Sequence, residues 1–228
     1  MSDVTLSYKG SDILELSDSG SATLKTGGTY CEADIELEYV KPSGGMTLGI
    51  QYDAYQSTGN HLPTEITFIG DEIVGGFGRW GFNLPIDKVN APDAIRLNGQ
   101  AMRLFKGSNM QDLVLPKVEY IAGGDTIYDC NFPRIFMPLL NTNLENATMT
   151  GQIYDTVLTY IEIGSLGHPV IKNFGGNFFK GNSQAFDVVI YTDKTTLAEA
   201  QALFTTAPWN GTNATITYKN STTGEVLT

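Results

Sequence analysis

The chain has 228 residues and a formal net charge of −11, from 14 basic and 25 acidic side chains. Hydrophobic residues make up 41% of it, enough for a packed core, and its 25 glycines are typical of a turn-rich β protein. The acidic balance argues against a nucleic-acid surface and against docking on anionic membranes, because both depend on Lys and Arg. No apolar run reaches transmembrane length, so we expect no membrane insertion.

The first 40 residues predict a small β unit. Residues 4–8 and 35–39 alternate between apolar and polar side chains, and residues 13–16 and 22–25 predict two further strands. The N-terminus has no basic segment followed by an apolar one, so we expect no secretory signal and synthesis in a cytoplasm. Cys31 and Cys130 are therefore expected to be unpaired thiols, although a disulfide is the alternative.

A resemblance to a known module lies inside this unit, in the run SATLKTGGTYCEADI at positions 21–35. It resembles a short β module of tail and baseplate-associated proteins in phages and prophages of Gram-positive gut bacteria. The alternative is a generic β-meander. In such proteins the module precedes a variable distal domain, which implies that residues 1–40 attach the chain to other virion proteins or to copies of itself.

Residues 41–45 (KPSGG) predict a linker, because they combine Pro and Gly and carry no apolar pattern. Residues 46–88, with predicted strands at 46–55 and 66–69, are expected to form an irregular N-terminal cap on the repeats that follow. The Gly- and aromatic-rich stretch at 75–82 is either part of this cap or a loop that presents Trp80. Exposed aromatic rings bind sugars through apolar contact, so the candidate ligand-binding residues are Tyr52, Tyr55 and Trp80.

Residues 89–191 repeat with a period of 22 to 26 residues. Apolar segments precede a turn residue at Pro92, Pro116, Pro138 and Gly164. Aromatic markers follow them 23, 26 and 25 residues apart, at Phe105, Tyr128, Tyr154 and Phe179. A period of this length is typical of a solenoid. We therefore predict a mainly β fold with a stack of four or five rungs, and a core of Leu115, Val118, Ile121, Ile127, Leu140, Leu144, Ile161, Ile163, Val188 and Ile190.

The second unit is the most regular. Leu115-Pro116-Lys117-Val118-Glu119-Tyr120-Ile121 is similar to the L-P-x-V-x-x-I segment of the BspA-like leucine-rich repeats, but Tyr128 and Cys130 depart from the following A-F-x-x-C spacing. This resemblance implies a right-handed stack with a parallel sheet on one side and no catalytic residues.

Residues 192–228 are expected to form the C-terminal cap of the stack, as strand, helix and strand. Residues 188–191 predict a buried strand and residues 214–218 a final one. Thr196 and Glu199 form the spacing of a capping box, in which each side chain satisfies the other residue's backbone amide.

Motifs for catalysis, metals or cofactors are absent from the sequence. His61 and His168 lack any metal-ligand spacing, and neither a nucleophile elbow nor a phosphate-binding glycine loop is present. Asp71, Glu72, Asp125, Asp129 and Asp155 are the carboxylates that a polysaccharide-cleaving enzyme would use. Asp129 and Asp155 occupy equivalent repeat positions, but turn residues that bond their own backbone fit both better.

We therefore expect a non-enzymatic virion protein of a phage, in its tail, baseplate or fibre, that contacts a cell-surface glycan. A BspA-like bacterial adhesin and a polysaccharide-cleaving virion enzyme are the two alternatives, in that order.

Overall fold

The structure of the chain is a computed structural model, and it describes the residues in thirteen segments. These are residues 3–8, 11–16, 22–24, 65–69, 72–75, 87–99, 110–122, 127–128, 132–140, 153–154, 157–171, 184–203 and 213–228. Within them the architecture is mainly β, as predicted, and the one helix described is α2 (Leu197–Leu203).

The described strands form four sheets. The long sheet is entirely parallel and has the order β15 (Asn213–Asn220), β14 (Ala185–Thr192), β13 (Tyr160–Ile163), β11 (Arg134–Met137) and β8 (Asp112–Val114). The N-terminal sheet has the order β3 (Ala22–Leu24), β2 (Ser11–Leu16), β1 (Asp3–Tyr8), β4 (Glu65–Ile69) and β6 (Lys88–Asn90). The back sheet, also parallel, is β5 (Glu72–Gly75), β7 (Arg96–Gly99) and β9 (Tyr120–Ala122), and the small sheet pairs β10 (Ile127–Tyr128) with β12 (Ile153–Tyr154).

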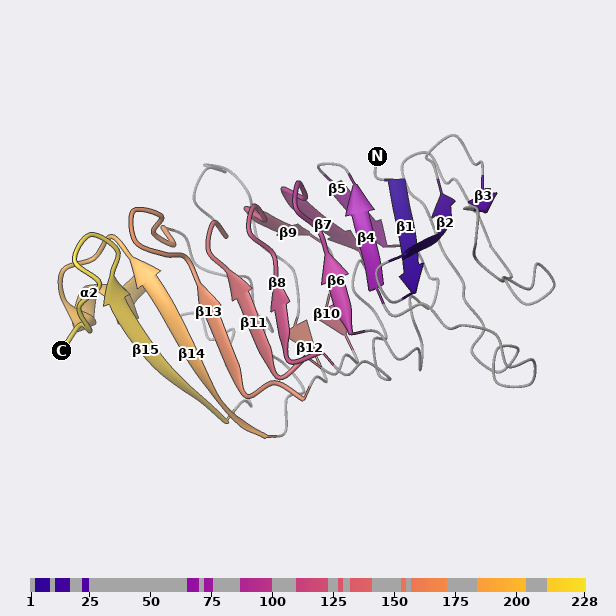
Figure 1. Cartoon of the computed structure of the whole chain (residues 1–228). Helices are drawn as coiled ribbons and strands as arrows, with labels where there is room; N and C mark the ends of the chain where they lie inside the picture. Colours follow the sequence, from indigo (N-terminus) through magenta and orange to yellow (C-terminus); the bar gives the residue numbers. More distant parts are fainter. Residues whose placement is uncertain are drawn as a thin grey trace.

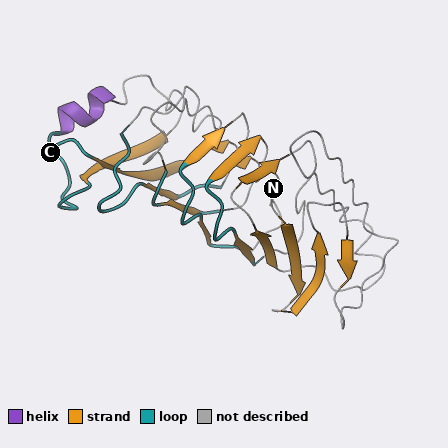
Figure 2. Ribbon diagram, turned by 90° about the horizontal axis from the view of Figure 1, so that it is seen from above, coloured by secondary structure: helices purple, strands orange, loops and turns teal. Residues whose placement is uncertain are grey.

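Successive units of the chain visit the sheets in turn. The chain runs from β8 in the long sheet to β9 in the back sheet and β10 in the small sheet, then returns to the long sheet as β11. Parallel strands need such long crossovers, because a tight turn joins only antiparallel neighbours. Figure 1 shows β4, β6, β8, β11, β13, β14 and β15 side by side in chain order, and Figure 2 shows the strands of the back sheet as a separate layer.

The register of the long sheet confirms the alignment of the turn markers. Leu113 pairs with Ile135, and Ile135 pairs with Ile161. Each of the three lies three positions before a marker, Pro116, Pro138 or Gly164. The aromatic markers Tyr128 and Tyr154 are also paired, in the small sheet. Phe105 and Phe179 lie outside the described residues.

The core lies on the inner side of the long sheet. Its strands alternate, so that Ile161 and Ile163 are fully buried while the residues beside them are half-buried. Leu97 of β7 and Ile121 of β9 are fully buried on the back sheet. Of the predicted core residues, nine have relative exposures of 0%: Leu115, Val118, Ile121, Ile127, Leu140, Ile161, Ile163, Val188 and Ile190. Leu144 lies outside the described residues.

The predicted strands of the N-terminal unit at 4–8, 13–16 and 22–25 are confirmed as β1, β2 and β3, which form an antiparallel meander. β1 also pairs antiparallel with β4, from Asp3 opposite Ile69 to Ser7 opposite Glu65. The N-terminal unit therefore shares a sheet with the strand predicted at residues 66–69. The linker at 41–45, the strand at 35–39 and both cysteines lie outside the described residues.

The C-terminal segment has the predicted order of strand, helix and strand, with β15 added in parallel to β14 over its whole length. The capping box is formed: the Glu199 amide donates to Thr196 Oγ1 at 3.3 Å, and the Thr196 amide donates to Glu199 Oε2 at 3.2 Å. The chain then folds back, and the Leu227 amide donates to the Tyr218 carbonyl at 2.9 Å. This return stretch pairs with the C-terminal half of the edge strand β15.

Candidate functional site

The exposed face of the long sheet carries two rows of side chains that run across its five strands. The pairing registers place one residue of each strand in each row. The charged row is Asp112, Arg134, Tyr160, Asp187 and Thr215. The mixed row is Val114, Phe136, Glu162, Val189 and Thr217, in which Val189 is buried, with only 8% of its surface exposed. Neighbouring strands lie about 4.8 Å apart, so each row extends over roughly 19 Å.

The charged row begins with an ion pair. Arg134 Nε lies 2.5 Å from Asp112 Oδ1, and Arg134 Nη2 donates to Asp112 Oδ2 at 2.9 Å. Both side chains are substantially exposed, at 50% and 39%. An exposed pair of this kind adds little to stability, but the two-pronged geometry fixes the orientation of both groups.

An aromatic pair occupies the middle of the face. The rings of Phe136 and Tyr160 have centroids 5.7 Å apart and are tilted by 47°. The Tyr160 hydroxyl donates to Glu162 Oε2 at 2.6 Å. Burial of the ring, with this hydrogen bond next in importance, raises the pKa of Tyr160 well above its ordinary value of 10. The tyrosine is therefore a neutral donor at physiological pH, held in place beside a carboxylate.

A second aromatic contact lies further along the same face. Lys219 Nζ is 5.3 Å from the centre of the Tyr191 ring, and the two residues are directly paired between β14 and β15. An ammonium group over an aromatic face is a favourable cation–π contact. The described face thus combines half-buried rings with fixed carboxylates, a guanidinium group and an ammonium group.

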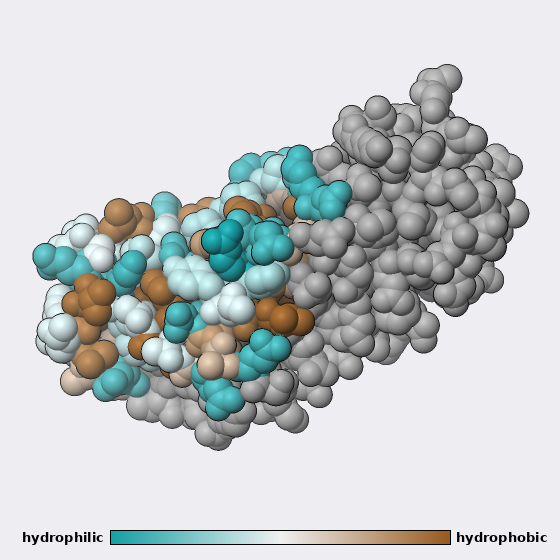
Figure 3. Space-filling model, turned by 60° about the horizontal axis from the view of Figure 1, so that its bottom comes forward, coloured by the Kyte–Doolittle hydropathy of each residue, from teal (hydrophilic) through white to brown (hydrophobic). Residues whose placement is uncertain are grey.

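This composition suits a ligand that is both apolar and rich in hydroxyl groups. Aromatic and aliphatic side chains can contact the C–H faces of a sugar ring, while carboxylates accept hydrogen bonds from its hydroxyls. In the face turned forward in Figure 3, the hydrophobic residues of the described part form separate small groups among hydrophilic ones. Such a mixed surface differs from the large apolar patch that typically marks a protein interface.

The structure does not place the residues that the sequence singled out. Tyr52, Tyr55 and Trp80 all lie outside the described residues. The same is true of four candidate carboxylates, Asp71, Asp125, Asp129 and Asp155, and Glu72 is described only as part of the backbone of β5.

Sequence reasoning missed the residues of the exposed face, above all Phe136, Tyr160 and Glu162. The signal for them was the alternation in Tyr160–Ile163, in which the two isoleucines point to the core and therefore direct Tyr160 and Glu162 outward.

In the described part of the chain, no group of three or more His, Cys, Asp and Glu side chains is arranged to hold a metal ion. The described part of the chain also holds no helix that is long and apolar enough to cross a membrane.

Comparison with known proteins gives a partial similarity. The chain is 30% identical over 109 residues to the Histidine biosynthesis bifunctional protein HisB of Stenotrophomonas maltophilia (strain R551-3). The match covers 44% of this chain and 30% of that protein, so the chain spans less than a third of the length of the curated relative it matches. No family model and no solved structure matches.

Proposed function

We propose that this chain is a non-enzymatic component of a phage virion, in its tail, baseplate or fibre, and that it contacts a cell-surface glycan. The glycan lies across the exposed face of the long sheet. Residues 1–40 attach the chain to other virion proteins or to copies of itself. In this account the parallel strands are the rungs of a right-handed solenoid, and the segment after residue 191 caps it.

The resemblance at residues 21–35 supports the virion assignment. The antiparallel meander β1–β3 fits both this module and the alternative of a generic β-meander. In the long, back and small sheets, each strand pairs with the strand one repeat further along the chain, and this supports the solenoid. Stacked repeats offer an extended surface to a polymer, because equivalent positions recur at every strand.

The observation that carries the glycan proposal is the contact between Phe136, Tyr160 and Glu162. The rings supply an apolar platform, and the carboxylate beside them supplies an acceptor. Rigid aromatic rings lose little conformational entropy on binding, so weak contacts at several strands add up along a polymer. Multiple copies on a particle would raise the avidity further.

Binding to purified cell-wall polysaccharide of the host tests this function. We expect the full chain to be retained on the polysaccharide, and Phe136→Ala to weaken retention by about tenfold, since aromatic contacts contribute on the order of 1–2 kcal/mol. Val157→Ala, which also removes an exposed apolar side chain but from outside both rows, serves as the control.

Retention that is unchanged in Phe136→Ala would contradict a binding role for the exposed face. Release of soluble sugar fragments during the assay would contradict the non-enzymatic assignment and favour a polysaccharide-cleaving enzyme.

A further inference from the structure

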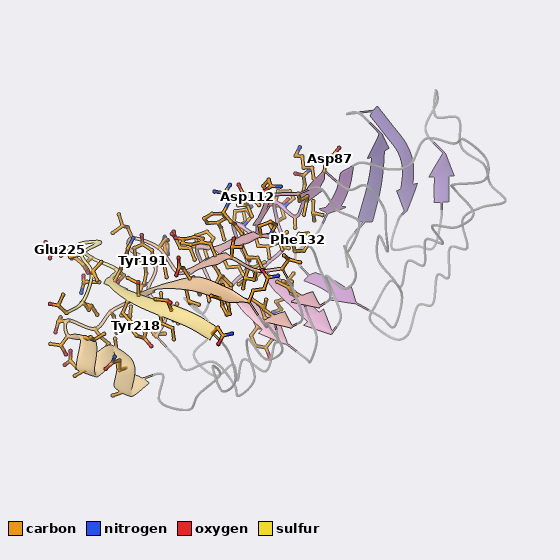
Figure 4. All side chains as sticks on the ribbon, turned by 90° about the horizontal axis from the view of Figure 1, so that it is seen from below. Asp87, Asp112, Phe132, Tyr191, Tyr218 and Glu225 are labelled. Atoms are coloured by element: carbon orange, nitrogen blue, oxygen red, sulfur yellow. The ribbon has the colours of Figure 1, made fainter. Side chains whose placement is uncertain are left out.

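A pocket opens where two of the sheets meet. β6 is an edge strand of the N-terminal sheet, and β8 is an edge strand of the long sheet. These two described strands are not paired with each other, so the two sheets stay separate. The pocket has a volume of about 360 Å³. Residues 87–92 line one side of it, and Asp112, Val114 and Pro116 line the other. Figure 4 shows Asp87 and Asp112 on the same side of the ribbon, with Asp87 at the end of the described side chains.

Two contacts join the two walls of this pocket at one of its ends. Lys117 Nζ lies 2.6 Å from Asp93 Oδ1, directly after the two prolines of the pocket. The Glu119 amide donates to the Ile95 carbonyl at 2.9 Å, which ties the same two units together on the way to the back sheet. The ion pair is exposed and adds little to stability, so the backbone hydrogen bond is the firmer link between the two units at this end.

The lining combines groups of two kinds. Asp87, Lys88, Asn90 and Asp112 supply acceptors and donors, and Arg134 orients Asp112 from outside the pocket. A carboxylate has about four lone-pair sites, so Asp112 can accept further hydrogen bonds while Arg134 occupies two. Pro92, Pro116 and the half-exposed Val114, at 48%, supply apolar surface. A ring with hydroxyls on its rim and C–H groups on its faces matches both kinds of lining.

Charge selects among such rings. The pocket holds two carboxylates and one ammonium group, and Arg134 compensates the charge of Asp112, so the lining itself is close to neutral. The whole chain, however, carries a net charge of −11. A sugar acid would meet repulsion from the negative field of the chain, whereas a neutral sugar would not. The volume lies near the lower end of the range of about 300–1,000 Å³ for small-molecule sites, which suits one ring or two.

We propose that this pocket binds one neutral sugar ring, the end residue of a glycan whose following residues lie over Phe136 and Tyr160. This inference rests on the proposed glycan binding. It adds the place where the end of the polymer binds and the class of its terminal sugar. Val114 and Asp112 belong both to the pocket and to the two rows, so the pocket opens directly onto the exposed face.

Titration of the full chain with single sugars tests the pocket, by calorimetry or ligand-observed NMR with glucose, galactose, N-acetylglucosamine and glucuronic acid. We expect at least one neutral sugar to bind, and the acid to bind at least about tenfold more weakly. Val114→Trp fills the pocket without removing a polar group, and it should weaken the neutral sugar by at least about tenfold. Val157→Trp is the matched control, because Val157 is a similarly exposed valine, at 43%, outside the pocket.

Equal binding of the neutral sugar by Val114→Trp and wild type overturns the proposed pocket. If wild type still binds the polysaccharide in that case, the exposed face alone accounts for the proposed function. Preference for the acid overturns the charge argument. Binding of a neutral sugar without retention of polysaccharide overturns the proposed function and keeps the pocket. Absence of binding to every single sugar overturns the pocket, and it overturns the proposed function as well only if the polysaccharide is not retained.

Discussion

The Tyr160 hydroxyl and the Glu162 carboxylate are hydrogen-bonded at 2.6 Å, although the two residues belong to one strand and are only two positions apart. Side chains at i and i+2 project from the same face of a strand, so a tyrosine can lean along the strand and reach such an acceptor. The bond fixes both groups in the middle of the exposed face.

The titration of Tyr160 follows from this contact. Its pKa is raised in the folded chain, so the unfolded chain releases this proton first, near the ordinary value of about 10. The contribution of Tyr160 protonation to the free energy of unfolding is therefore complete below pH 10, and it is lost as the pH rises through the folded-state pKa. We expect Tyr160→Phe to reduce the fall in the free energy of unfolding above pH 10, measured by urea unfolding at several pH values. A pH dependence identical to that of wild type would contradict the contact.

The core register predicts unequal costs for two adjacent residues. Leu115 is fully buried, so Leu115→Ala should lower the free energy of unfolding by about 2–5 kcal/mol. Val114→Ala, at a side chain 48% exposed, should change it by less than about 0.5 kcal/mol. Denaturant unfolding measures both, and a higher cost for Val114→Ala than for Leu115→Ala would show that the strand is turned the other way.

Substitution of two glycines in one turn distinguishes the cost of backbone strain from the cost of a steric clash. Gly164 and Gly167 have φ angles of 74° and 78°, and both disfavour any other residue. A Cβ at Gly164 would lie 2.9 Å from the His168 carbonyl oxygen, whereas one at Gly167 would meet nothing within 4 Å. Gly167→Ala should cost about 1 kcal/mol from strain, and Gly164→Ala more than that. Thermal unfolding compares them, and the reverse order would count against the turn.

The capping box at α2 predicts sensitivity to acid. Thr196→Ala should destabilise the chain by about 0.5–2 kcal/mol through loss of the cap. The hydrogen bond from the Thr196 hydroxyl, foremost, lowers the pKa of Glu199 below its ordinary value of 4.5. The contribution of the ionised Glu199 to the free energy of unfolding is therefore present above pH 4.5, and it is lost as the pH falls through the folded-state pKa. The difference between wild type and Thr196→Ala should shrink between pH 7 and pH 3, and a constant difference would contradict the reciprocal cap.

The sequence predicted the repeats best where two signals coincided. Leu115, Val118 and Ile121 fit an apolar spacing and follow a proline marker, and all three are fully buried. The parallel pairing, however, extends to β4 and β15, which lie outside residues 89–191, where the turn markers occur. The positions there that correspond to the prolines are Ile69 and Lys219, so these strands carry no turn marker that sequence inspection could align.

The candidate site was harder to predict than the fold. The predicted ligand-binding residues were Tyr52 and Tyr55 of a tyrosine-rich predicted strand and Trp80 of a glycine-rich stretch, whereas Phe136 and Tyr160 lie in or next to apolar segments of the repeats. Which of two alternating sets points outward follows from period 2, but which outward residues meet across strands depends on the register. Only the three-dimensional pairing places Phe136 opposite Glu162.

The central claim is that this chain is part of a phage particle and faces the host. Negative-stain microscopy tests it most directly, on particles purified from the strain that encodes the chain and labelled with gold-conjugated antibodies against residues 157–228. We predict gold at the distal end of the tail, at the baseplate or along the fibres. Particles that carry no label, together with recovery of the chain at the bacterial surface, would contradict the claim and favour an adhesin.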